Sequence, residues 1–101
     1  MENTISKYFT VLQDDYIIFL QYLKARFPAF HNSNLFFRDL HYAIKHFLEM
    51  KDMKVNYADS EQITREFSEF LENKGILVKV NDIGWKLNYA DFTTVKPGDP
   101  F

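Results

Sequence analysis

Apolar residues recur at helical spacing over the first stretch of the chain, from about Thr4 to Phe27. Positions i, i+3, i+4 and i+7 fall on one side of a helix, so this stretch is predicted to form an amphipathic helix with a buried apolar face. Asp15 stands at the edge of that face, which leaves two alternatives: one continuous helix, or a helix broken near Asp14 and Asp15. Pro28 disfavours helical geometry in the residue before it and is expected to end the segment.

A second stretch with helical spacing runs from Leu35 to about Lys51. Ser33 or Asn34 is placed to cap its first turn, because a short polar side chain can accept a hydrogen bond from a free amide there. The residues predicted to face the core are Phe36, Phe37, Leu40, Ile44, Phe47 and Leu48. The segment from Lys51 to Ala58 is predicted to be a connection.

A third helix is predicted to begin at Asp59, where its carboxylate or the Ser60 hydroxyl can act as N-cap. The apolar stripe of this helix consists of Ile63, Phe67, Phe70 and Leu71. Gly75 stands where a helix often ends in a left-handed residue, a conformation that glycine adopts at low cost. The helix is therefore expected to end just before Gly75.

Alternation with a period of two follows Gly75 and predicts two strands, each with one buried face. In the first strand, Ile76, Val78 and Val80 alternate with Leu77 and Lys79. In the second strand, Trp85, Leu87 and Tyr89 alternate with Lys86 and Asn88. The four residues from Asn81 to Gly84 supply a turn between the two strands. Trp85 is expected to pack against the helices with Phe67 and Leu71.

The segment LENKGILVKVNDIGWKLNY and the helix that contains its first residues resemble the last third of a winged-helix domain. The resemblance is one of pattern, and it implies a third strand, which we expect near Met53 to Tyr57. The predicted fold is α+β: three helices followed by a C-terminal β-hairpin, winged-helix-like. We expect one small domain over residues 1–95 and a flexible tail over residues 96–101.

The composition predicts one folded domain that needs no crosslinks. Hydrophobic residues make up 47% of the 101-residue chain, which is enough for a core. The chain has no cysteine, which excludes disulfides and thiolate metal sites. No stretch approaches the ~18 apolar residues that a transmembrane helix needs, and the first residues do not follow the pattern of a secretory signal. A cytoplasmic protein is therefore expected.

No catalytic, metal or cofactor site is predicted from the sequence. His41 and His46 stand five positions apart, so they lie on different sides of a helix. A helical zinc pair needs ligands three or four positions apart. Asp14 and Asp15 point about 100° apart on a helix, so they are poorly placed to share a proton. No glycine cluster is present to hold a phosphate. These observations favour a non-enzymatic protein without cofactors.

Two helix surfaces are the candidate interaction faces. The first is the basic stripe on the outer face of the second helix, where Arg38, His41 and Lys45 stand at i, i+3 and i+7. The second is the outer face of the last helix, which carries Glu61, Arg65, Glu69 and Glu72.

The acidic character of the second face decides between two functions. The resemblance implies that the exposed face of the last helix would enter the DNA major groove, where three carboxylates beside Arg65 would oppose the phosphates. The formal net charge of −2 likewise differs from that of a strongly basic DNA-binding domain. We therefore favour a protein-binding module with an unidentified partner. One possibility is a homodimer in which a symmetric helix–helix contact covers Ile17. The alternative is a DNA-binding transcriptional regulator, although nucleic acid is disfavoured.

Overall fold

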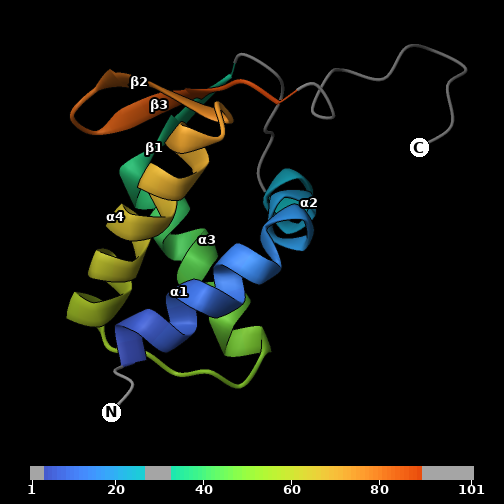
Figure 1. Ribbon diagram of the computed structural model, residues 1–101, viewed down its shortest axis with the longest axis vertical. Coiled ribbons are helices and arrows are strands. Elements are labelled where there is room, and N and C mark those ends of the chain that lie inside the picture. The colour runs from blue at the N-terminus through green and yellow to red at the C-terminus, as the bar shows by residue number, and fades with distance from the viewer. Residues whose placement is uncertain (1–3, 27–32, 90–101) are drawn as a thin grey trace, which may run out of the picture.

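The computed structural model describes residues 4–26 and 33–89, which form a small α+β domain (Figure 1). The helices of these residues are α1 (Thr4–Asp14), α2 (Tyr16–Arg26), α3 (Phe37–Met50) and α4 (Tyr57–Asn73). The strands are β1 (Asn34–Phe36), β2 (Leu77–Asn81) and β3 (Gly84–Leu87). The predicted α+β class with a hairpin near the C-terminus is confirmed. The predicted domain boundary at residue 95, the tail over residues 96–101 and Pro28 lie outside the described residues.

The first predicted helix is broken at Asp15, so residues 4–26 and 33–89 contain four helices rather than the three expected. The Asp15 amide donates to Val11 over 3.0 Å, and its carbonyl accepts from the Phe19 amide over 2.8 Å, so hydrogen bonding continues across the turn. The Asp15 carboxylate lies 2.7 Å from Lys51 Nζ, which ties the bend to the end of α3. In Figure 1, α1 runs across the lower part of the domain and α2 turns away from it.

The three strands form one antiparallel sheet in the order β1-β3-β2. The third strand lies at Asn34–Phe36, where Leu35 pairs with Trp85, and the prediction of a strand near Met53 to Tyr57 is wrong. Residues 53–56 form no strand, because Asn56 caps α4 by accepting from the Asp59 amide over 2.8 Å. The predicted caps are therefore also wrong: α4 begins two residues before Asp59, and α3 begins after Phe36 with no side-chain cap.

The core lies between the helices and is closed at one end by the sheet. Phe19 of α2 is fully buried and packs edge-to-face on Phe47 of α3 and Phe67 of α4, with ring centroids 5.3 and 5.2 Å away. The residues of the sheet that belong to this core are Leu35, Leu77, Trp85 and Leu87. The prediction that Trp85 belongs to the same core as Phe67 is confirmed.

The alternation in β2 places its two valines on the solvent side of the sheet. Leu77 lies opposite Leu87, and both are buried, whereas Val78 lies opposite the exposed Lys86. The pairing shifts between Lys79 and Asn81, where Val80 bulges from the ladder. Gly75 has φ 76°, so the predicted left-handed helix end is confirmed.

Candidate interaction surfaces

The outer face of α3 differs from the predicted basic stripe at its central residue. Arg38 is exposed and Lys45 is half-buried, but His41 is only 5% exposed and points toward α4. Tyr42 is the residue beside Arg38 on the outer face, with Arg38 Cζ 5.8 Å from the centre of its ring. The stripe Arg38, His41 and Lys45 is therefore not a continuous surface, because the turn of the helix carries His41 inward.

His41 is part of a buried polar contact between α3 and α4. Its Nε2 lies 2.6 Å from Ser60 Oγ, and Ser60 Oγ donates to the Tyr57 carbonyl over 2.9 Å. A hydroxyl has one proton to donate, so both bonds are satisfied when the neutral imidazole donates from Nε2 to Ser60. Burial lowers the pKa of His41; Glu61 acts in the opposite direction, and Lys45 lowers the pKa further.

This serine–histidine pair has a structural role. Ser60 is fully buried and His41 is only 5% exposed, and neither lines the three cavities described below. A nucleophile must reach its substrate, so the contact holds α3 against α4 rather than forming a reactive centre. Over residues 4–26 and 33–89, no group of three or more His, Cys, Asp or Glu side chains is placed to hold a metal ion.

The outer face of α4 forms one wall of a small cleft against the hairpin. The cleft has a volume of about 190 Å³, and its charged lining residues are Arg65, Glu69, Glu72, Lys79 and Asp82. Three carboxylates and two cations therefore line this cleft. Glu72 accepts a hydrogen bond from the Trp85 indole over 2.7 Å, so it is held against the sheet.

Arg65, the one cation on this face of α4, is already engaged by its neighbours. Its guanidinium lies 3.7 Å from the Glu61 carboxylate one helical turn before it. Its Cζ also stands 5.2 Å from the centre of the Phe37 ring. Glu61 and Arg65 thus form an ion pair along the helix, and contact with a phosphate would compete with that pair.

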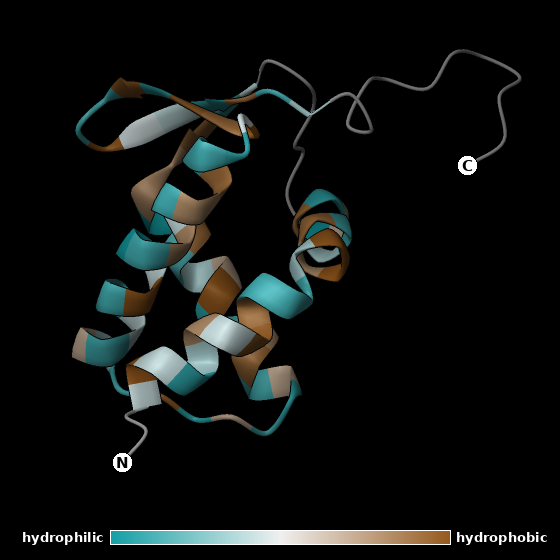
Figure 2. Ribbon diagram, in the orientation of Figure 1, coloured by the Kyte–Doolittle hydropathy of each residue, from teal (hydrophilic) through white to brown (hydrophobic). Residues whose placement is uncertain are grey.

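The solvent side of the sheet carries an apolar surface that we call the outer sheet face. It consists of Phe36, Val78, Val80 and Ile83, with 48%, 49%, 56% and 64% of their surface exposed. Figure 2 shows hydrophobic residues along β2 and in the turn that joins it to β3. Gly84 lies under Phe36, because a Cβ on this glycine would meet Phe36 Cδ1 at 3.3 Å. The missing side chain lets Phe36 lie across the sheet.

A cavity of about 460 Å³ adjoins this face between β1, the start of α3 and the hairpin turn. Its lining residues are Phe36, Phe37, Arg38, Asp39 and Ile83. The outer sheet face is therefore a shaped apolar surface rather than a set of scattered side chains. Sequence reasoning did not find it, because a period of two predicts a buried face without identifying which of the two faces is buried.

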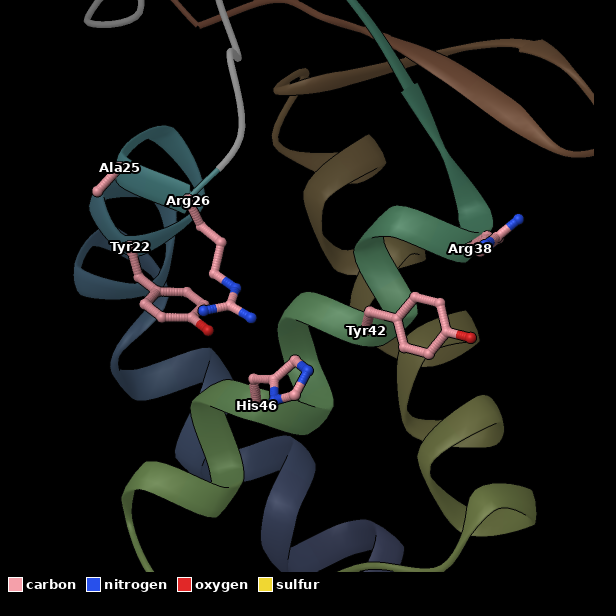
Figure 3. A pocket seen from close by; sticks show the side chains of 6 residues that line it. All are labelled: Tyr22, Ala25, Arg26, Arg38, Tyr42 and His46. Carbon is pink, nitrogen blue, oxygen red and sulfur yellow. The ribbon is translucent and has the colours of Figure 1, made fainter.

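A basic and aromatic groove lies between α2 and α3 (Figure 3). We call it the α2–α3 groove; its volume is about 900 Å³, and its lining residues are Tyr22, Ala25, Arg26, Arg38, Tyr42 and His46. Tyr22 and Arg26 reach from α2 toward His46, and Tyr42 and Arg38 continue the surface along α3. The sequence pointed to Arg38 alone, since the contribution of α2 depends on the bend at Asp15.

Ile17 is 42% exposed on α2, beside Ile18 at 55%. The homodimer contact expected through Ile17 stays a prediction. None of the helices in residues 4–26 and 33–89 has the length and apolar character required to cross a membrane. Comparison with known proteins found no matching family model, no matching curated protein and no matching solved structure.

Proposed function

We propose that the protein is a non-enzymatic, winged-helix-like interaction module that binds another protein through the outer sheet face. The order of the elements supports the winged-helix resemblance. The usual arrangement places a helix between the third strand and the last helix, and α3 lies between β1 and α4 in this way. The hairpin β2–β3 follows α4 directly and occupies the position of the wing.

The exposed outer sheet face is the observation that carries the proposal. Single exposed apolar residues are common, but a contiguous patch of large ones usually marks an interaction site. Phe36 and Ile83 border an apolar cavity, and aromatic residues that become buried on binding dominate the energy of many protein interfaces. Strand β2 also stands at the edge of the sheet, where a partner strand can pair with its backbone.

The regulator alternative requires α4 to approach DNA, and the charges on α4 oppose that approach. Glu69 and Asp82 lie in the same small cleft as Arg65, and a phosphate there would meet carboxylates at short range. Protein surfaces impose no such requirement for positive charge. The α4 cleft therefore supports a protein partner over DNA.

We expect a photo-crosslinking amino acid placed at Val80 to attach to discrete protein partners in the cells that make this protein. Val80 is 56% exposed on the outer sheet face, so the probe points at whatever covers the sheet. The matched control is the same probe at Met50, which is 65% exposed at the end of α3. Mass spectrometry before and after nuclease treatment identifies the attached molecules.

The adducts at position 80 should resist nuclease and disappear on Val78→Lys, because a lysine beside the probe adds charge to the apolar contact. Identical adducts at positions 80 and 50 would show that the outer sheet face is not selective and would overturn the proposal. Adducts that nuclease removes would favour the regulator.

A further inference from the structure

The α2–α3 groove presents two arginines that have no carboxylate partner among the described residues. Each guanidinium instead faces a tyrosine ring: Arg26 Cζ is 6.0 Å from the centre of Tyr22, and Arg38 Cζ is 5.8 Å from the centre of Tyr42. Stacking on a ring restricts the flat guanidinium while its edge remains able to donate hydrogen bonds. The groove therefore contains two oriented cations, one contributed by each helix.

Tyr22 adds a buried polar group in need of a partner. Its hydroxyl is buried and has no hydrogen-bond partner within the described part of the chain. A buried hydroxyl without a partner loses its hydration and gains nothing in return, which is unfavourable. Tyr22 lines the groove beside Arg26, so a movement of either side chain that uncovers the hydroxyl would let an acceptor meet it beside a guanidinium.

His46 lies opposite Tyr22 and Arg26 in the groove. Its Nδ1 lies 3.4 Å from Glu49 Oε1, one helical turn further along α3. That contact fixes the orientation of the imidazole, since a carboxylate at one ring nitrogen determines which way the other nitrogen points. The donors of the groove are therefore the two guanidinium groups, which suit carboxylate oxygens.

The ligand class follows from the balance of charge and aromatic surface. A nucleic-acid backbone needs many phosphate contacts for affinity, and this groove has only two arginines to offer. Glu49 and Asp39 stand on the same helix as Arg38 and would repel a uniformly charged polyanion. A short peptide can instead place separated carboxylates at Arg26 and Arg38 and lay its apolar side chains on the tyrosines between them.

We infer that the α2–α3 groove binds a short acidic segment of the protein partner. This inference rests on the proposed function, since it assigns the partner's chemistry at a second surface. A volume of about 900 Å³ falls within the range of known ligand pockets and accommodates a few residues of an extended peptide. The carboxylates of that peptide accept hydrogen bonds from Arg26 and Arg38.

The test is selection from a displayed library of random short peptides by the purified, folded protein. We expect the recovered peptides to be enriched in aspartate and glutamate relative to the starting library. Binding of a recovered peptide should weaken about tenfold or more on Arg38→Gln and on Arg26→Gln, because a hydrogen bond to a charged group contributes roughly 1.5–3 kcal/mol. Both arginines are exposed, so neither change should affect folding.

Lys45→Gln is the matched control, since Lys45 lies on α3 but does not line the groove. Equal losses at Lys45 and Arg38 would show a non-specific charge effect and would overturn the inference. Recovery of peptides without acidic enrichment, recovery of none, or displacement of the recovered peptide by random duplex DNA would also overturn it. The crosslinks at Val80 are independent of the groove, so failure here alone would leave the proposed function intact.

Discussion

Replacing Trp85 with alanine is expected to lower the free energy of unfolding by about 3–5 kcal/mol, as for other large buried aromatic residues. Trp85 is only 5% exposed and joins the sheet to the helical core. Its ring centre lies 6.2 Å from that of Phe37, and its indole nitrogen donates to Glu72 over 2.7 Å. The substitution removes both the packing and the polar contact between β3 and α4.

The variant Trp85→Phe separates these two contributions in denaturant melts. It keeps most of the ring volume but loses the indole donor, so we expect a loss of only about 1–2 kcal/mol. A loss below about 1 kcal/mol for Trp85→Ala would contradict the assignment of this side chain to the core.

Replacing His41 with alanine is expected to lower the free energy of unfolding by about 2–3 kcal/mol near neutral pH. The imidazole packs against Tyr57, whose ring centre is 4.9 Å away, and makes the 2.6 Å contact with Ser60. Alanine leaves a cavity between α3 and α4 and removes one hydrogen-bond partner of a fully buried hydroxyl. The same change at the exposed His46 is the matched control.

The pH dependence of stability should also follow His41. Burial lowers the pKa of its imidazole below the ordinary value of 6.5, so the unfolded chain binds a proton more readily than the folded one. Stability from this group is therefore fully present above pH 6.5, falls as the pH drops through 6.5, and levels off below the pKa of the folded state. Chemical denaturation across this range should show a slope that His41→Ala reduces. An unchanged slope in His41→Ala would contradict this role.

The helical pattern predicted much of α3 and α4 because their apolar residues repeat over several turns. Ile63, Phe67 and Leu71 are all fully buried, as the spacing of the last helix indicates. The short strand β1 was missed for a physical reason. Leu35 and Phe36 continue an apolar run into α3, and pairing with β3 over three residues has no periodic signature of its own.

The candidate surfaces were harder to predict than the helices, because they depend on rotations of single side chains. The spacing i, i+3 and i+7 predicts a shared face for Arg38, His41 and Lys45. In the structure His41 turns toward α4 and is buried. The α2–α3 groove requires the bend at Asp15, a feature for which the sequence left two alternatives. The acidic cleft was predictable, since Glu69 and Glu72 lie on the polar side of a long regular helix.

Whether the domain reads a DNA sequence is measured most directly by selection from a random duplex pool, followed by titration of the selected and random duplexes at two salt concentrations. We predict no enriched motif, because carboxylates of α4 and the hairpin surround Arg65. Any residual binding should be weak, sequence-tolerant and steeply salt-dependent, and should depend on Arg38 rather than Arg65. Enrichment of a defined motif, with affinity lost on Arg65→Ala but kept on Arg38→Ala, would contradict the protein-binding proposal and establish α4 as a reading helix.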